Sequence, residues 1–421
     1  MSSAATACRG RTLRESPHQG ATAIKLQTKN KIRRTTIKYK SIRPWIVVLG
    51  AWCASFCTFG WINSIGTFQN YYESILLKEY SSSTIAWIPS LQIFFMMAMA
   101  IGALHDKFGH RSLLATGTIL HTLGIFMASI SHKYYQIFLS QGVCSAIGTA
   151  AIFLPTLPVV KEWFNGKGEK AKALAVVTTG SSLGGVIFPI MTSRLINIIG
   201  FGWSMRISAF LILFLLIIAN LTIRPFPQEV ESILRNDIPF VILTIGLLVY
   251  AFGYFVPINY IAAEATAKGV DPNLIQYLIP ILNAASLFGR LLSGFAAGKM
   301  GPYLVFLTAC FVTSVLILAV WTLTATVVSR ICFAVVFGFF SGGFIALIPA
   351  LVHSKDNEEN DGFKIGIAFF SASFGGLTTN PICGAILASD TSWVGPKCFA
   401  GALSLAGTVI ILAAKYPAWG L

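Results

Sequence analysis

Long apolar runs dominate the chain, and they carry too few charges for a water-soluble fold. Two of the longest cover residues 209–223 and 238–261. Only 11% of the 421 residues are charged and 55% are hydrophobic, whereas soluble domains are about 25% charged. The mean hydropathy is +0.72. Runs near the roughly 20 residues that cross about 30 Å of hydrocarbon predict membrane-spanning helices. We therefore expect an all-α membrane protein.

Twelve such helices fit between short polar segments. The expected spans are 45–67, 84–104, 112–130, 134–158, 173–197 and 203–223, followed by 239–262, 274–296, 302–323, 328–352, 364–388 and 395–415. This spacing predicts two six-helix bundles, at residues 44–223 and 239–421, joined by a connector at 224–238. An even number of crossings puts both termini on one side of the membrane.

The positions of Lys and Arg predict which side that is, because cytoplasmic loops carry an excess of these residues. Residues 1–43 hold eleven of them and a single acid, Glu15, and no apolar core of the kind a cleaved signal peptide has. The opposite side has only Lys78, Lys133, Lys268 and Lys397. We expect cytoplasmic termini, a disordered basic tail over 1–43, and the plasma membrane as the location. The acid-poor start also fits a mitochondrial transit peptide.

Other classes of function find little support. The net charge of +15 does not indicate nucleic-acid binding, because the basic residues lie in the tail and at segment ends. Cys53 and Cys57 lie on one helix face, but no His or carboxylate accompanies them, so we expect no metal site. No Walker loop is present, and no cofactor is expected.

The two halves share a repeated pattern, which predicts a duplicated six-helix unit. After the second and eighth spans, Gly102, Asp106, Lys107 and Gly109 are matched by Gly294, Gly298, Lys299 and Gly301 at an offset of 192. Pro155 and Lys161 are matched by Pro349 and Lys355 at an offset of 194.

The segment GALHDKFGHR at 102–111 resembles the signature loop of the major facilitator superfamily. Segments GTFQNYY (66–72), STIAWI (83–88), GSSLGGVIFP (180–189) and NAASLFGR (283–290) are similar to the fungal branch of its monocarboxylate porter family. The resemblance runs from about Trp45 to the last span. It implies the major facilitator fold and a transporter that works by alternating access.

The signature loop holds the residues that we expect to control conformational change. Asp106 lies at a helix end before a tight turn at Gly109, with Lys107 and Arg111 beside it. These charges are suited to bind the end of a neighbouring helix and latch one conformation. The alternative is a loop with solvated charges. Gly298 replaces the acid expected in the second half, so any latch is one-sided.

Arg290 is the candidate for substrate binding, because it lies well inside the eighth span. An arginine there costs about 2.5–3.5 kcal/mol on insertion scales, yet the acids fall in loops or at span ends. A guanidinium without an acidic partner suits a carboxylate, which it binds through paired donors. Alternatively, Arg290 extends toward the cytoplasmic end of its helix or binds backbone carbonyls.

The resemblance adds further candidate residues. In animal porters an arginine similar in position to Arg290 contacts the substrate carboxylate. An aspartate involved in proton coupling stands at the position of Ser286, and a substrate-binding lysine at that of Asn63. Two of three charged groups are thus missing, which favours a larger, more apolar organic acid or a secondary metabolite over lactate. Asn283 and Tyr254 are further candidates for substrate contact.

Two more expectations concern the cavity wall and proton coupling. Phe59, Trp61, Tyr254 and Phe255 would line a cavity for an apolar solute, or simply pack helices together. His121, inside the third span, is a candidate for proton coupling because histidine titrates near neutral pH; its alternative role is structural.

We therefore predict a secondary transporter for a monocarboxylate-like organic anion or a secondary metabolite, acting as a monomer in the lipid bilayer. One alternative is an efflux pump for an uncharged or larger metabolite. Another is a nutrient sensor that keeps the transporter fold without transporting. An enzyme is not expected, because no intramembrane acid, histidine cluster or nucleophile with a base is present.

Overall fold

The computed structural model describes residues 42–97, 100–164, 167–224, 238–352, 361–389 and 392–415. A few side chains inside these ranges, those of 100–108 among them, are outside the description. The predicted basic tail at 1–43 therefore lies almost entirely outside the described residues, as does most of the predicted connector at 224–238.

The first six expected spans are confirmed as helices. The first crossing consists of α2 (Arg43–Ser55), the π-helical η1 (Phe56–Gly60), α3 (Ile65–Tyr71) and a second π-helix, η2 (Tyr72–Leu76). The next two run through α4 (Ser82–Ile85), α5 (Trp87–Met96) and α6 (Ala100–Ala128). The remaining three are formed by α7 (Tyr134–Ile137), η3 (Phe138–Ser145) and α8 (Ala146–Glu162), then by α9 (Lys167–Ile199), and finally by α10 (Phe201–Thr222).

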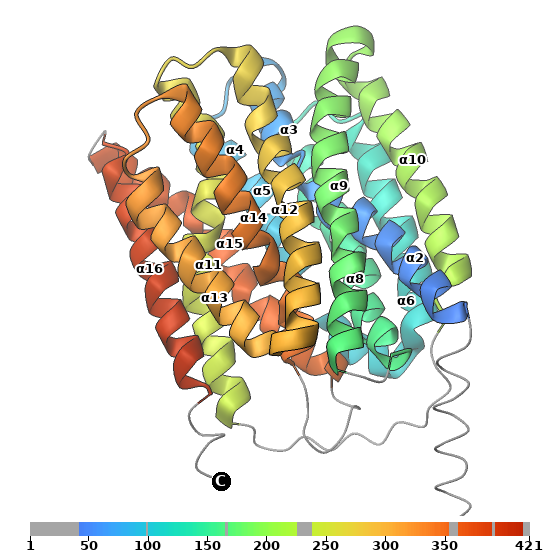
Figure 1. The fold of residues 1–421 in the computed structure, drawn as a ribbon. Coiled ribbons are helices and arrows are strands. Elements are labelled where there is room, and N and C mark those ends of the chain that lie inside the picture. Colours follow the sequence, from blue (N-terminus) through green and yellow to red (C-terminus); the bar gives the residue numbers. More distant parts are fainter. Residues whose placement is uncertain are drawn as a thin grey trace, which may run out of the picture. The chain divides into compact units, whose positions relative to one another are not determined.

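The last six spans are helices as well. They are α11 (Ile238–Ala267), α12 (Pro272–Met300), α13 (Pro302–Val315) continued by η4 (Leu316–Trp321), α14 (Val327–Leu351), α15 (Asp361–Ser389) and α16 (Val394–Ala413). The described residues contain no strand (Figure 1). The predicted all-α fold is thus confirmed.

Glycines with positive φ mark where one crossing ends and the next begins. Gly109 interrupts α6 with φ +74°, so this long helix holds the end of the second crossing and all of the third. Gly301 has φ +89° between α12 and α13. Only glycine adopts such angles without strain. The two glycines are one of the matched pairs of the predicted repeat.

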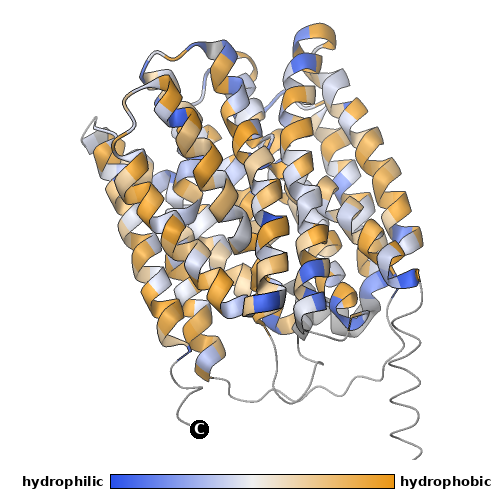
Figure 2. Cartoon of the chain, in the orientation of Figure 1, coloured by the Kyte–Doolittle hydropathy of each residue, from blue (hydrophilic) through white to orange (hydrophobic). Residues whose placement is uncertain are grey.

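The outer surface of the helices is suited to lipid. Within the described residues, nine helices are long and apolar enough to cross a membrane. Large apolar side chains such as Leu123, Phe210 and Phe214 are exposed, and hydrophilic residues gather near helix ends (Figure 2). In water these side chains would be a liability, whereas hydrocarbon accepts them.

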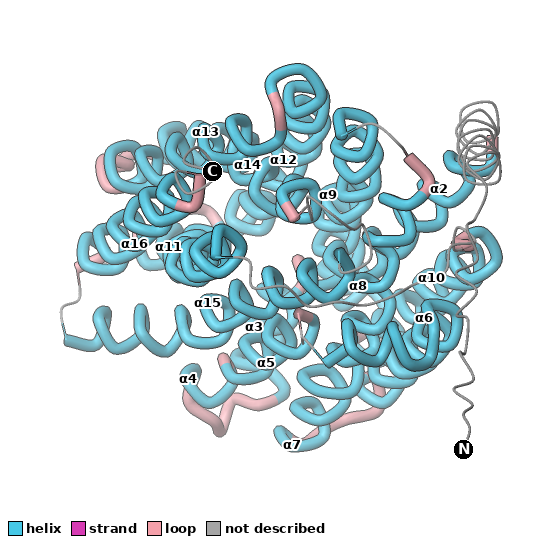
Figure 3. Tube along the Cα trace, turned by 90° about the horizontal axis from the view of Figure 1, so that it is seen from below, coloured by secondary structure: helices cyan, strands magenta, loops and turns pink. Residues whose placement is uncertain are grey.

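We call the end of the bundle where α2 begins and α16 ends the terminal side, and the opposite end the far side (Figure 1). Helix α9 of the first half and α12 of the second lie side by side (Figure 3). On the terminal side their backbones nearly touch, because a Cβ on Gly168 would lie 2.9 Å from the carbonyl oxygen of Gly298. A Cβ on Gly298 would instead meet the flexible end of the Lys172 side chain at 2.9 Å and the carbonyl oxygen of Gly168 at 3.4 Å.

A hydrogen bond also joins the two halves on the terminal side. The Nζ of Lys161, at the end of α8, donates a hydrogen bond of 2.7 Å to the carbonyl oxygen of Val352, just after α14. Lys161 is buried. Lys161, one of the residues matched in the predicted repeat, therefore joins the two halves.

Candidate functional site

A cavity lies between the two halves and is lined by residues of both. Its volume is about 220 Å³. Gln69 and Ala262 line it near the far-side ends of their helices, and Ala86 lines it in the turn between α4 and α5. Arg290 lines it deeper, toward the terminal side. The cavity therefore extends from the far side into the middle of the bundle, whereas the contacts at Gly168 and Lys161 lie on the terminal side.

Arg290 is buried, with 6% of its surface exposed, and three hydrogen bonds fix its guanidinium. Its Nε donates to Ser286 Oγ on the same helix at 3.2 Å. Its Nη1 donates to the carbonyl oxygen of Thr178 at 2.8 Å and to Ser181 Oγ at 2.6 Å, both on α9. The guanidinium thus joins α12 to α9. Its bond to Thr178 agrees with the alternative prediction that Arg290 binds backbone carbonyls.

These partners are neutral, so they orient the guanidinium without cancelling its charge. No described carboxylate forms an ion pair with Arg290, and no described residue accepts a hydrogen bond from its Nη2. Two of the five N–H donors therefore remain for another molecule. A bidentate contact through Nη2 and a second nitrogen would have to displace the hydroxyl of Ser286 or Ser181 or the carbonyl oxygen of Thr178.

The residues at the two positions that carry charge in animal porters also line the cavity. Ser286 accepts from Arg290 and from Ser182 Oγ, the latter at 3.4 Å. Asn63 lies in the turn between η1 and α3, where its Nδ2 donates to the carbonyl oxygen of Phe59 at 2.7 Å. Irregular backbone of this kind is tolerated at membrane depth where it lines a cavity.

Asn283 bridges the halves near this turn. Its Nδ2 donates to Asn63 Oδ1 at 3.3 Å and to the carbonyl oxygen of Ile279 at 3.0 Å. Gly185 on α9 makes room for the pair, since a Cβ there would lie 2.6 Å from the Asn283 Cγ. Asn63 and Asn283 therefore form a polar contact between the halves at the cavity wall.

Tyr254 lines the cavity, and no described residue accepts or donates a hydrogen bond at its hydroxyl. Phe59 and Phe255 line it too, as expected. For Trp61 the alternative expectation, helix packing, holds. Its ring is 1% exposed and packs against Phe68 and Phe188, because it lies on the side of its helix that faces the first bundle.

The candidate residues for gating are only partly described. The side chains of Asp106 and Lys107 lie outside the described residues. Gly109 takes the positive φ that a tight turn needs, and Arg111 is exposed. The latch between this loop and a neighbouring helix stays a prediction.

His121 is fully buried and is not among the residues that line the cavity. Its Nε2 lies 3.1 Å from the carbonyl oxygen of Cys57, to which it must donate. Its Nδ1, 2.9 Å from Ser145 Oγ, then accepts from the hydroxyl. These bonds satisfy a neutral imidazole and join α6 to η1 and η3. The role in proton coupling stays a prediction.

The sequence analysis missed a second polar group in the cavity, which we call the amide cluster: Asn259, Tyr260, Asn380 and Ser90. Asn259 Nδ2 donates to Asn380 Oδ1 at 2.9 Å, and Asn380 Nδ2 donates to Ser90 Oγ at 3.3 Å. Tyr260 Oη donates to the carbonyl oxygen of Asn380 at 2.8 Å. The signal was the presence of two asparagines inside apolar spans, where polar groups need partners.

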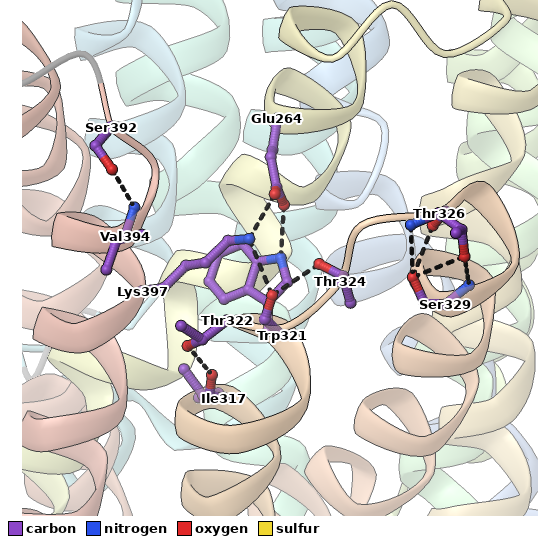
Figure 4. A network of polar contacts seen from close by, with 10 residues as sticks. All are labelled: Glu264, Ile317, Trp321, Thr322, Thr324, Thr326, Ser329, Ser392, Val394 and Lys397. Atoms are coloured by element: carbon purple, nitrogen blue, oxygen red, sulfur yellow. Dashed lines mark hydrogen bonds and ion pairs between the residues drawn. The ribbon is translucent and has the colours of Figure 1, made fainter.

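A buried ion pair was also missed. Lys397 Nζ lies 2.5 Å from Glu264 Oε1 and donates at 2.9 Å to the carbonyl oxygen of Trp321. Trp321 Nε1 in turn donates to Glu264 Oε2 at 2.7 Å (Figure 4). The sequence analysis counted Lys397 among the charges on the side opposite the termini, and Glu264 among the acids in loops or at span ends. The group joins α11, η4 and α16 and does not line the cavity.

Neither a metal site nor a set of catalytic groups emerges from these contacts. Among the described residues, no group of three or more His, Cys, Asp or Glu side chains is placed to hold a metal ion. What the cavity offers is a partly free guanidinium, hydroxyls, carboxamides and aromatic rings. Such groups bind an amphipathic organic solute without reacting with it.

Comparison with known proteins gives a consistent result. The family model described as Major Facilitator Superfamily matches residues 47–249 and 240–418. The chain is similar to the MFS transporter asaE of Aspergillus flavus, with 50% identity over 90% of this chain and 88% of the relative. It is 44% identical to the fujikurins efflux protein of Gibberella fujikuroi, over 88% of this chain and 82% of the relative.

A third relative is the agnestins efflux protein AgnL12 of Paecilomyces divaricatus, 36% identical over 89% of this chain and 87% of that one. Among solved structures, the fucose:proton symporter FucP of E. coli matches with a TM-score of 0.67 and 14% identity, over 88% of this chain and 99% of FucP. The proton:xylose symporter XylE matches with a TM-score of 0.68 and 11% identity, over 89% and 96%. At such low identity these structures are similar in fold alone.

Proposed function

Because the chain belongs to the major facilitator superfamily, we propose that it is a secondary transporter for an organic anion, a monocarboxylate-like acid or an acidic secondary metabolite. That it is a multi-pass membrane transporter rather than an enzyme follows from the family and from the named relatives. The solute, the direction and the alternating-access mechanism are the proposal. Two relatives are named as efflux proteins, which favours export.

The observation that carries the proposal is the state of Arg290. Its charge faces the cavity without an acidic partner among the described residues, and its Nη2 still has two N–H groups. Burying a charge is costly unless it is paired. An anionic solute would pair with it only while it is carried, so the same contact supplies both affinity and selection for negative charge.

The size of the cavity supports a solute larger than lactate. A water molecule takes up about 30 Å³ in the liquid, so 220 Å³ corresponds to about seven waters. Apolar residues such as Phe59, Phe255 and Ile93 form much of the wall. A medium-sized acid with an apolar body would fill this space better than a short hydroxy acid.

Membership in the fungal branch of the monocarboxylate porter family, the plasma membrane, cytoplasmic termini and action as a monomer remain parts of the proposal. With cytoplasmic termini, the terminal side faces the cytoplasm and the cavity opens outward. Export of an uncharged metabolite is the second candidate function, favoured by the mostly apolar wall. A non-transporting nutrient sensor is the third, and solute flux separates it from the other two.

The proposal is tested with the full chain in proteoliposomes. We expect labelled medium-sized apolar carboxylates to be taken up, and each acid to compete at least about tenfold better than its methyl ester, because the ester has no charge for Arg290. Lactate and pyruvate should compete poorly. Empty liposomes are the control.

Two results would contradict the proposal in different ways. Equal competition by acids and esters would favour the transporter of uncharged solutes. Saturable binding of the acids without any flux would favour the sensor.

A further inference from the structure

The amide cluster leaves hydrogen-bonding capacity facing the cavity. The carboxamide of Asn259 is half-buried and lines the cavity. Its nitrogen uses one hydrogen for Asn380 and retains a second, and no described residue donates to its oxygen. A carboxamide has two donors and an acceptor with two lone pairs. Asn259 can therefore offer one donor and one acceptor, side by side, to another molecule.

The surrounding contacts hold this carboxamide in place. Asn380, its partner, is fixed on one side by Ser90 of the first half and on its backbone by Tyr260. Because the partner is anchored from both halves, Asn259 has little freedom to turn away and pair elsewhere. A recognition group of this kind is oriented before the ligand arrives, which lowers the entropy lost on binding.

The helix geometry gives the depth of the cluster relative to Arg290. Asn259 lies eight residues before Ala267, the end of α11, and Arg290 lies eighteen residues after Pro272, the start of α12. The loop between these helices covers only residues 268–271, so their far-side ends lie at similar depth. At 1.5 Å per residue, Arg290 is about 15 Å deeper than Asn259.

Between the two polar groups the cavity wall is mainly apolar. Phe59, Phe255 and Leu282 line it in this part of the bundle, together with Tyr254 and the contact between Asn63 and Asn283. The two ends differ chemically, because one offers a cation and the other a neutral donor and acceptor. A ligand that satisfies both ends has an anionic group, an apolar body and a second polar group.

We propose that Asn259, oriented by Asn380, forms a second recognition site in this cavity for an amide or lactam group of the carried anion. The inference rests on the proposed function, because it adds a second contact to an anion bound at Arg290. An amide pairs with both the free donor and the free acceptor of Asn259. An ester cannot donate, and a hydrocarbon end leaves both groups unpaired in an apolar wall.

The test compares three probes of equal chain length: the half-amide of dodecanedioic acid, its methyl half-ester, and dodecanoate. The carboxyl and amide carbons of the half-amide are about 14 Å apart when the chain is extended. Equilibrium binding is measured for the full chain in nanodiscs, and binding to empty nanodiscs is subtracted. We expect the half-amide to bind at least about tenfold more tightly than the ester or dodecanoate.

Substitutions of Asn259 test whether this residue contacts the amide group of the probe. Asn259→Leu keeps the approximate volume of the side chain. It should reduce the affinity for the half-amide to that for the ester, and it should change the affinity for dodecanoate by no more than about twofold. Asn259→Ala should do the same if leucine prevents folding. Asn273→Leu is the matched control, because Asn273 is exposed near the start of α12 and does not line the cavity.

The outcomes separate this inference from the proposed function. Equal binding of all three probes, or an amide preference that survives in both Asn259 variants, overturns the second recognition site. If, after either of these results, the Arg290→Ala variant binds none of the three probes, the proposed function stands. An amide preference that depends on Asn259, with binding unaffected by Arg290→Ala, keeps the second site and removes the anion site. Absence of binding by every probe overturns both.

Discussion

Replacing Arg290 with alanine is expected to abolish transport of organic anions and to remove the preference for an acid over its methyl ester. The substitution leaves the carboxylate of the solute without a cation in a buried site, and losing one member of such a buried charge pair costs about 2–5 kcal/mol. This corresponds to a rise of at least about thirtyfold in the half-saturating concentration. Initial uptake rates in proteoliposomes measure the effect.

Arg290→Lys should recover transport only in part. Lysine keeps the positive charge but cannot donate simultaneously to Ser181, Thr178 and the solute in the planar arrangement that the guanidinium provides. Arg194→Ala is the matched control, because Arg194 is exposed, donates to Tyr277 Oη and does not line the cavity. Anion uptake that is unchanged in both Arg290 variants would remove this residue from the site.

The largest effect on stability is expected at Lys397. Lys397→Met removes the cation that pairs with Glu264, which is 1% exposed. Removing one partner of a buried ion pair typically destabilises a protein by about 3–5 kcal/mol, because the other charge stays buried. The thermal midpoint of the purified protein in detergent should therefore fall sharply.

The double variant Glu264→Gln/Lys397→Met should recover much of this loss, since no charge is then left buried and glutamine can still accept from Trp321 Nε1. Lys268→Met, which changes an exposed lysine of the following loop, should leave the midpoint unaltered. The account of this ion pair fails if Lys397→Met is as stable as the unmodified chain, or if the double variant is no more stable than the single one.

The sequence was sufficient for the fold because the apolar runs are long and the breaks between them are chemically distinct. The spacing is less regular at α6, which holds the end of the second crossing and all of the third and is interrupted at Gly109. The first crossing was harder to delimit. Its π-helices and the turn at Asn63 continue the helical path to Leu76, and no simple periodicity predicts a turn of this kind.

The candidate site was predicted less completely, because polar partners in the bundle are far apart in the sequence. Arg290 could be singled out by its cost in an apolar span, but its bonds to Thr178 and Ser181 reach across 112 and 109 residues. Glu264 and Lys397 are 133 residues apart. No spacing rule connects such residues, so only the packing of the helices brings them together.

The sequence analysis missed the amide cluster for a different reason. An asparagine in an apolar span carries no charge, and the sequence analysis weighed charges first. Asn259 and Asn380 are 121 residues apart, so each looked like an isolated polar residue. Asn283 was chosen only because it belongs to a motif that resembles a family pattern, and its contact with Asn63 could not be read from the sequence.

The central claim is that the guanidinium of Arg290 binds the negative charge of the carried solute. An experimental structure of the full chain with a transported carboxylate bound tests it most directly. We predict a carboxylate oxygen within hydrogen-bonding distance of Arg290 Nη2, while Nη1 keeps its bonds to Thr178 and Ser181. A carboxylate bound elsewhere, with no polar contact to Arg290, would contradict the claim.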